Sequence, residues 1–329
     1  MKYLMMSAAA IAIALPGLAQ ADDLRFALVP KAMNNPFFDL ARDGCHRAQD
    51  ELDGVECVYI GPGEHTELEQ IQIVQDLITQ GVDGIAVSPS NAPAMARAVR
   101  AAEEAGIPVI TWDSDFLEED QNLRETYIGT HNYDIGVELA KLAQERHPDG
   151  GSLCIQTGGA AAANHNERIL GIRETLAGEE RGDPPGDRLT GEGGWTEIAA
   201  CPHITDDDGT RAVQGMTDIL ASEPDLTAFI STGAFTQWLD GAYRQAVGPY
   251  RDRLEAGDLS ILVADTLPMQ MEQLQDGLSN GQVGQRPFEM GYRSMFVLKD
   301  IVDGEEVDDP IFTGLDVCTQ ENAEDCLES

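Results

Sequence analysis

Positive charge is scarce in this chain. Its 329 residues include 21 Lys and Arg against 58 Asp and Glu, which gives a formal net charge of −37 at pH 7. Nucleic-acid phosphates and anionic membrane surfaces attract cationic proteins, so we expect neither as a partner. The acidic residues are spread along the chain rather than gathered in a tail. This pattern is typical of an adaptation for solubility in a saline environment, where salt screens the repulsion between the acidic residues. The net charge says little about the ligand.

Long hydrophobic runs are also rare. The apolar run from Leu4 to Leu15 covers about 12 residues, whereas a membrane span needs about 20. Lys2 precedes this run, and the small residues of Ala19-Gln20-Ala21 follow it. This pattern predicts a signal peptide over residues 1–21 with cleavage after Ala21. The first cysteine is Cys45, so a lipid anchor at the new N-terminus is not expected. We therefore expect a protein exported to the periplasm, without insertion into the membrane.

Motifs of catalysis and cofactor binding are missing from the sequence. There is no G-x-S-x-G, no P-loop, no H-E-x-x-H and no G-x-G-x-x-G after the first predicted strand. There is no C-x-x-C either, and the histidines are scattered, so a zinc site is not expected. The sequence thus indicates no enzyme, no metal and no cofactor. Six cysteines in an oxidising compartment favour disulfides, and closeness in sequence suggests the pairs Cys45–Cys57, Cys154–Cys201 and Cys318–Cys326.

Short apolar segments alternate with helix-length amphipathic segments from Leu24 onward. The first half predicts strands at 24–29, 55–60, 84–89 and 108–112, with helices at 36–52, 67–80 and 92–105. After residues 126–132 the pattern restarts, with strands at 152–156, 196–201, 226–231 and 260–265, a short strand or crossover at 281–287, and an extended segment at 309–315. Helices are predicted there at 133–146, 167–176, 209–221, 238–246, 268–275 and 289–302. Such alternation indicates an α/β fold whose two parallel-sheet lobes face a cleft.

Polar and aromatic side chains follow the predicted strands, where ligands of open parallel sheets bind. The candidate ligand-binding residues are Lys31, Asn35, Phe37, Phe38, Trp112, Asp113, Asp115, Asn166, Arg168, Thr232, Phe235, Asp265 and Gln285. Carboxylates and amides form hydrogen bonds with hydroxyl groups, and flat rings stack on the C–H faces of a sugar ring. This set therefore predicts a polyhydroxylated ligand.

Several of these residues also have a purely structural interpretation. Asn34 or Asn35 can cap the helix that begins at Pro36, and Phe37 and Phe38 can belong to the core. Asp113 and Asp115 can cap the segment that follows them, and Arg168 can be a solvated helix residue. His165 also follows a strand, but no nearby residue completes a catalytic triad with it.

Four stretches together resemble one known family over essentially the whole predicted mature chain. FALVPKAMNNPFFDLARDG, GVDGIAVSP, GIPVITWDSD and YIGTHN are similar to the type I periplasmic sugar-binding proteins of ABC transporters, in the ribose-binding group. The resemblance implies that Asn35, Phe37 and Phe38 hold the sugar from the N-terminal lobe. By the same resemblance, Asp113 and Asp265 are the two ligand carboxylates, and Asn166 and Gln285 are further contacts.

Two positions depart from the ribose-binding pattern, because Lys31 and Ser114 stand where a small polar residue and an arginine are expected. LVPK, YIGPGE and TWDSD instead look like the autoinducer-2-binding and rhamnose-binding branch, in which the lysine and the first aspartate contact the ligand. Asn166 and Thr232 do not match that branch. A pentose, a deoxy sugar, a polyol and a furanosyl signal all stay open as ligands.

The resemblance implies two doubly wound parallel-sheet lobes joined by a three-segment hinge near Thr130, Gln285 and Gly314. The N-terminal lobe is expected to comprise 22–130 and 286–313, and the C-terminal lobe 131–285 and 314–329. It also implies a monomer that closes on its ligand and delivers it to ABC permease and ATPase subunits. Two alternatives stay open: a protein that presents its ligand to a receptor kinase or chemoreceptor, and an exported sugar-acting enzyme.

Overall fold

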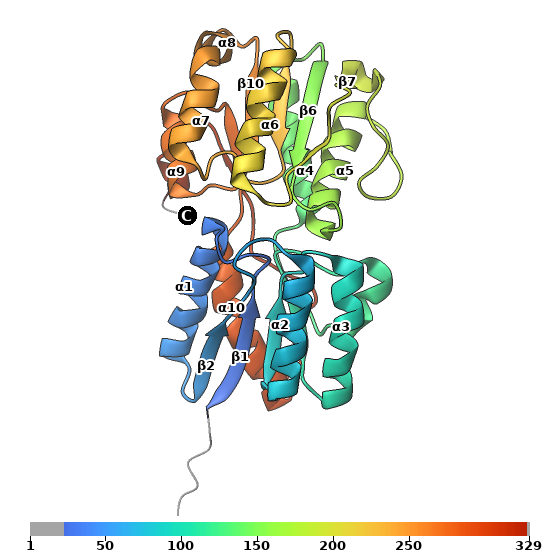
Figure 1. Cartoon of the computed structure of the whole chain (residues 1–329), viewed down its shortest axis with the longest axis vertical. Coiled ribbons are helices and arrows are strands. Elements are labelled where there is room, and N and C mark those ends of the chain that lie inside the picture. Colours follow the sequence, from blue (N-terminus) through green and yellow to red (C-terminus); the bar gives the residue numbers. More distant parts are fainter. Residues whose placement is uncertain (1–22, 328–329) are drawn as a thin grey trace, which may run out of the picture.

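The computed structural model describes residues 23–327, which form two α/β lobes placed end to end along the long axis of the molecule (Figure 1). The signal peptide predicted at 1–21 lies outside the described residues. Between residues 23 and 327, the structure contains no helix that is both long enough and apolar enough to cross a membrane.

The N-terminal lobe is built on a six-stranded parallel sheet in the order β12-β5-β4-β3-β1-β2. Its strands are β1 (Leu24–Val29), β2 (Val55–Tyr59), β3 (Gly84–Val87), β4 (Val109–Trp112), β5 (Tyr127–Gly129) and β12 (Ile311–Phe312). Its helices are α1 (Pro36–Glu51), α2 (Glu67–Gln80), α3 (Ala92–Ala105) and α10 (Pro287–Asp303), with a 3-10 turn η1 (Glu118–Leu123).

The C-terminal lobe repeats this plan with the order β13-β11-β10-β9-β6-β7, and β8 also pairs with β6. Its strands are β6 (Gly151–Thr157), β7 (Trp195–Glu197), β8 (His203–Ile204), β9 (Ala228–Ser231), β10 (Ser260–Ala264), β11 (Gly281–Gly284) and β13 (Asp316–Cys318). Its helices are α4 (Asn132–Arg146), α5 (Ala163–Ala177), α6 (Gly209–Ser222), α7 (Asp240–Val247), α8 (Arg251–Ala256) and α9 (Pro268–Gln275), with 3-10 turns η2 (Glu192–Gly194), η3 (Gly248–Tyr250) and η4 (Asp325–Leu327). Only β13 pairs antiparallel among these described strands.

The chain crosses between the two sheets three times: from β5 to α4, from β11 to α10, and from β12 to β13. As a result α10, which comes late in the sequence, lies in the N-terminal lobe beside α1 (Figure 1). The exact lobe boundaries given from the sequence stay a prediction.

Glycines let one pair of helices in each lobe approach closely. A Cβ atom on Gly44 of α1 would lie 2.0 Å from the carbonyl oxygen of Phe288 in α10. In the C-terminal lobe, a Cβ atom on Gly136 of α4 would lie 2.1 Å from the carbonyl oxygen of Arg168 in α5. Only glycine fits at such backbone contacts. The second contact matters for the site because α5 carries Arg168.

Apolar clusters cover both faces of each sheet. Three disulfides support them, and the predicted pairs Cys45–Cys57, Cys154–Cys201 and Cys318–Cys326 are confirmed. Both cysteines of the first two pairs, and Cys318 of the third, belong to apolar clusters of their lobes, so the covalent links reinforce that packing.

Apart from shifts of a few residues at the ends of other elements, the structure differs from the sequence prediction most clearly at three segments. The strand expected at 196–201 ends at Glu197, because the chain turns at Ile198 toward Cys201, which is bonded to Cys154, and Pro202 has no N–H for a ladder. The extended segment expected at 309–315 divides, because β12 and β13 pair with different sheets. The helix expected at 167–176 begins four residues earlier, at Ala163.

Candidate ligand-binding site

A cavity of about 270 Å³ lies between the two lobes, at the carboxyl ends of their strands. It is lined by Lys31, Asn35, Phe37, Phe38, Asp113, Asn164, His165, Arg168, Asp207, Gly233, Phe235, Trp238, Asp265 and Gln285. The lining residues lie close together, so the free space between them is narrow in this conformation. A ligand bound there would contact both lobes.

The start of α1 forms the wall of the N-terminal lobe. The Asn35 side chain accepts a hydrogen bond of 2.9 Å from the Phe37 N–H and so caps α1, while Pro36 occupies the first turn. Asn35 also lines the cavity, so the capping and ligand-binding interpretations of this residue are compatible. Phe37 and Phe38 meet edge to face with ring centroids 5.3 Å apart, and both belong to the core as well as to the cavity wall.

Each lobe places one aspartate directly after an inner strand, in an unusual backbone conformation. Asp113 follows β4 with φ of 60°, and Asp265 follows β10 with φ of 75°. Their N–H groups donate in equivalent ways to Ile128 of β5 and Val283 of β11. A left-handed backbone is strained for residues other than glycine, and such strain is concentrated at functional sites. The two aspartates are thus held at equivalent positions facing the cavity.

Asp113 connects the lobes through a network of charged hydrogen bonds. Its carboxylate accepts from Ser88 Oγ at 2.7 Å and lies 3.2 Å from Lys31 Nζ, while Asn164 Nδ2 of the other lobe donates to it at 3.3 Å. Lys31 Nζ in turn donates to Asn164 Oδ1 at 2.9 Å. Burial raises the pKa of Asp113, but Lys31, Arg168 and the Ser88 hydrogen bond lower it by more. Asp113 is therefore ionised at neutral pH.

Asp265 has fewer partners. Gln285 Nε2 donates to it at 2.7 Å and the Ala234 N–H at 3.1 Å. Burial raises the pKa of Asp265, and the charge of Arg168 and the Gln285 hydrogen bond offset only part of this effect. Asp265 is thus a carboxylate that a ligand can reach.

Arg168 is fully engaged inside the C-terminal lobe. Its Nε and Nη2 donate to Asn132 Oδ1 at 2.9 and 2.7 Å, and its Nη1 donates to the Thr232 carbonyl at 2.7 Å. Its Nη2 lies 3.8 Å from Asp113. Only 2 % of Arg168 is exposed, so it is not a solvated helix residue. Its geometry fits positioning of α4, α5 and β9 around the cavity.

His165 lies in the cavity between a hydroxyl and a carboxylate. Its Nδ1 is 3.0 Å from Thr232 Oγ1, and its Nε2 is 3.6 Å from Asp207 Oδ1. Burial lowers the pKa of His165 to about 4, so the imidazole is neutral at neutral pH. Burial raises the pKa of Asp207, but the interactions with His165, His65 and Lys31 lower it by more, so this carboxylate is ionised.

Four of the predicted ligand residues do not line the cavity. Trp112 is buried in the core, where its ring packs against Phe38. Asp115 forms an ion pair of 2.7 Å with Arg124. Thr232 lies behind His165 rather than on the cavity surface.

Asn166 is the fourth of these residues, and it donates to the Ala160 carbonyl at 3.0 Å. Because α5 begins at Ala163, Asn164 faces the cavity, and residues two apart on a helix do not share a face. Asn164 therefore lines the cavity in the place that the sequence prediction gave to Asn166.

Five cavity residues were absent from the predicted set of ligand residues: Asn164, His165, Asp207, Gly233 and Trp238. The first two follow β6, so their position after a strand was the available signal. Asp207 stands in a run of three aspartates after β8, with φ of 56°. β8 has only two residues, so its hydrophobic pattern is too short to predict a strand.

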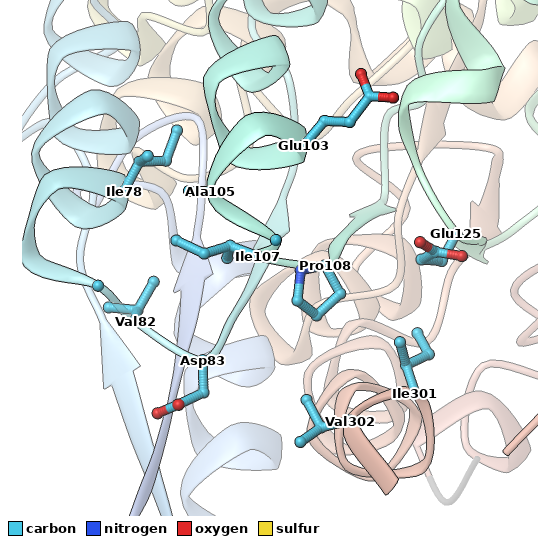
Figure 2. Close-up of a pocket in the computed structure, with 12 residues that line it drawn as sticks. Ile78, Val82, Asp83, Glu103, Ala105, Ile107, Pro108, Glu125, Ile301 and Val302 are labelled. Atoms are coloured by element: carbon cyan, nitrogen blue, oxygen red, sulfur yellow. The ribbon is translucent and has the colours of Figure 1, made fainter. Parts of the chain in front are cut away.

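A wider hollow of about 1280 Å³ lies at the other end of the N-terminal lobe, near the beginnings of β3 and β4. Figure 2 shows its apolar walls, made by Ile78, Val82, Ile107 and Val302, and the carboxylate of Glu103 near its edge. This hollow is at the amino ends of the strands, opposite to the end where parallel sheets bind ligands. The interlobe cavity is therefore the candidate site.

Metal binding has no structural support in the part of the chain that the structure describes. Residues 23–327 contain no group of three or more His, Cys, Asp or Glu side chains arranged to hold a metal ion. The carboxylates of the cavity instead face amides, cations and aromatic rings.

Two equivalent lobes with a polar and aromatic cavity between them define a two-lobed binding protein. The chain belongs to the periplasmic binding protein family, since residues 26–306 match the family described as periplasmic binding protein domain. It is 25 % identical over 305 residues to the ribose import binding protein RbsB of Salmonella typhimurium, covering 92 % of this chain and 93 % of that protein. It is 26 % identical to the D-ribose/D-allose-binding protein of Pseudomonas aeruginosa, covering 77 % of this chain and 74 % of that protein.

Solved structures show the same similarity. A solute-binding protein of an ABC transporter from Burkholderia graminis, solved in complex with D-arabinose, superposes with a TM-score of 0.77 at 31 % identity, covering 92 % of this chain and 97 % of that chain. GanP, a glucose-galactose binding protein from Geobacillus stearothermophilus, superposes with a TM-score of 0.76 at 26 % identity, covering 92 % of this chain and 99 % of that chain.

Proposed function

We propose that this chain is the periplasmic solute-binding component of an ABC importer, which binds one small monosaccharide or polyol and delivers it to the permease. The interlobe cavity is the observation that carries this proposal. It combines carboxylates from both lobes, Asp113 and Asp265, with aromatic rings from both lobes, Phe37, Phe38 and Phe235. Such a combination is complementary to a ring that carries hydroxyl groups on its edge and C–H groups on its faces.

The relatives support this class of ligand. The curated relatives named above are ribose and allose binders, and the solved structures hold or bind arabinose, glucose or galactose.

Domain closure provides the mechanism. Asn164 of the C-terminal lobe bonds to Lys31 and Asp113 of the N-terminal lobe, and the Ala92 N–H donates to the Ala161 carbonyl across the same gap at 3.1 Å. These contacts require the lobes to be close together. A ligand that contacts both lobes binds the closed form better and shifts the population toward it. We propose that the three crossings near Thr130, Gln285 and Gly314 bend during this closure.

Eight residues are proposed as direct ligand contacts: Lys31, Asn35, Phe37, Phe38, Asp113, Phe235, Asp265 and Gln285. Arg168 is proposed as a positioning residue, because three of its five N–H groups already donate to acceptors within the C-terminal lobe. The N-terminal lobe thus provides the stacking rings and the charged pair, and the C-terminal lobe provides a second carboxylate with its amide.

A thermal-shift screen of sugars and polyols tests the proposal. A ligand that binds the native state raises the melting temperature by mass action, and calorimetry then measures its affinity. We expect Asp113→Asn to abolish the shift. Asp115→Asn is the matched control, since this aspartate lies two residues away and outside the cavity, and we expect it to keep the affinity.

Three results would count against the proposal: no sugar or polyol gives a shift, both aspartate variants bind equally, or the bound sugar is chemically altered. The last result would instead favour an exported sugar-acting enzyme, because a binding protein returns its ligand unchanged.

A further inference from the structure

Among the described residues that line the cavity, three side-chain atoms are buried without a hydrogen-bond partner. They are Asp207 Oδ1, Gln285 Oε1 and Trp238 Nε1. A buried polar atom without a partner costs about 1–3 kcal/mol, so native proteins rarely leave one unsatisfied. These atoms mark where the ligand has to supply hydrogen bonds: two are acceptors and one is a donor.

Within the described part of the chain, Asp207 additionally has no lysine or arginine side chain within 4 Å of its carboxylate. It is 5 % exposed, and Lys31 and Arg168, the lysine and arginine in the lining of the cavity, are both engaged with Asp113. In residues 23–327, the only basic side chain within 4 Å of Asp207 is His165, which is neutral at neutral pH. An ionised carboxylate that is buried without a partner is strongly destabilising. Closing the cleft over a neutral ligand would isolate this charge further.

The His165 ring places a second polar atom beside Asp207. Its Nδ1 lies 3.0 Å from Thr232 Oγ1, and its Nε2 lies 3.6 Å from Asp207 Oδ1. A neutral imidazole carries one proton, and the Thr232 hydroxyl can accept that proton from Nδ1, which makes Nε2 an acceptor. In this tautomer, Nε2 and Asp207 Oδ1 are two acceptors 3.6 Å apart.

Gly158 makes room for this pair of acceptors. A Cβ atom at Gly158 would lie 2.0 Å from Asp207 Oδ1 and 2.6 Å from His165 Nε2. The end of β6 thus brings its backbone against both atoms, which holds them together at the cavity.

We propose that the ligand carries a protonated amino group that binds between Asp207 and His165, so that the substrate class is amino sugars or amino polyols. This inference rests on the proposed function. An ammonium group has three donors and no acceptor, and its charge compensates Asp207. A hydroxyl group has one proton, so it satisfies one of the two acceptors and leaves the charge uncompensated.

Calorimetry on matched pairs of ligands tests this proposal in the full mature protein. The ligands are D-glucosamine with D-glucose, D-galactosamine with D-galactose, and the neutral sugars and polyols of the thermal-shift screen. The variant is Asp207→Asn, which keeps the shape of the side chain and removes its charge. The matched control is Asp208→Asn, because Asp208 is exposed and caps α6, and asparagine caps a helix equally well.

We expect an amino sugar to bind at least about tenfold more tightly than its parent sugar, as for other charge-assisted contacts. Asp207→Asn is expected to remove this preference, whereas Asp208→Asn keeps it. Raising the pH through the pKa of the ligand amine is expected to weaken binding in the wild type.

The amino-group proposal is overturned if a neutral sugar or polyol binds more tightly than every amine, or if Asp207→Asn leaves the preference unchanged. Either result leaves the proposed function intact. The absence of binding by every sugar and polyol, with or without an amino group, would instead overturn the proposed function itself.

Discussion

The two lobes present equivalent aspartates in different electrostatic states. Asp113 of the N-terminal lobe is surrounded by Lys31, Ser88 and Asn164, whereas Asp265 of the C-terminal lobe has one amide side chain and one backbone N–H. Among the described residues, the same strand-end geometry thus holds a carboxylate that is paired with a lysine in one lobe and a carboxylate without a close cation in the other. The carboxylate of the N-terminal wall is therefore paired within the protein, whereas the C-terminal wall carries buried polar atoms without hydrogen-bond partners in residues 23–327.

The helices that follow the first strand of each lobe differ in the same way. Asn35 caps α1 through its side chain, but the N-cap residue of α5, Ala162, provides no side-chain cap. In α5 the polar residues of the first turn, Asn164 and His165, face the cavity instead. One helix start is therefore stabilised within its own lobe, and the other contributes its polar groups to the interlobe site.

The largest expected effect comes from breaking the network of the N-terminal lobe. Asp113→Ala leaves Lys31 buried without its anion, so we expect a loss of about 3–5 kcal/mol in the free energy of unfolding. We also expect affinity for the sugar found in the screen to fall about 100-fold or more. Denaturant titration and calorimetry measure the two effects.

The double variant Lys31→Met/Asp113→Ala separates stability from binding. It removes the unpaired cation, so it is expected to recover stability without recovering affinity. Unchanged affinity in Asp113→Ala would show that the N-terminal wall does not bind the ligand.

The disulfides offer a second way to compare the lobes. Cys154–Cys201 spans 47 residues and Cys45–Cys57 spans 12. By loop-closure entropy, replacing the first pair with alanine costs about 4 kcal/mol and replacing the second about 3 kcal/mol. Denaturant melts followed by tryptophan fluorescence check this order, and a larger loss from the shorter loop would contradict it.

A smaller effect is expected from Gly158→Ala. The added methyl group would collide with the ends of the Asp207 and His165 side chains, which can rotate away without disturbing the backbone. We expect about tenfold weaker ligand binding with little loss of stability, corresponding to about 1.4 kcal/mol. Gly241→Ala is the control, since a Cβ atom there meets no atom within 4 Å. Equal affinities of the two variants would remove Asp207 and His165 from the binding site.

The smallest effect on ligand affinity is expected at Glu167 on α5, which does not line the cavity and instead affects the pH dependence of stability. Burial first, and then the charge of Asp115, raise its pKa from 4.5 to about 7, although His131 and Arg168 act in the opposite direction. A carboxyl group with a raised pKa favours the folded state below its unfolded pKa, and this contribution is lost as the pH rises through about 7.

We therefore expect Glu167→Gln to be more stable than the wild type by roughly 1–3 kcal/mol at pH 8 and to match it near pH 4. Thermal melts across this range measure the difference, with the exposed Glu145→Gln as the control. A constant difference at all pH values would show that titration of Glu167 is not its cause.

Much of the fold follows from local patterns in the sequence. The bounds of β1, α2, α3 and α9 coincide with the predicted ones, because their apolar spacing and their flanking turns are clear. The cap at Asn35 and the three disulfides were also predictable, since both depend on residues close in sequence. Asp113 and Asp265 were located by their position after a strand, although their role in binding stays a prediction.

The tertiary structure decided which side chains of the C-terminal lobe meet at the cavity. An earlier start of α5 selects Asn164 over Asn166, and a two-residue strand carries Asp207 to a site that no local pattern indicates. Only the tertiary structure places Lys31 beside Asp113 and the neutral His165 beside Asp207, because these neighbours are distant in the sequence. The local sequence therefore determined the helices and strands and the cavity residues that follow β1. The packing of loops from both lobes determined which polar side chains line the rest of the cavity.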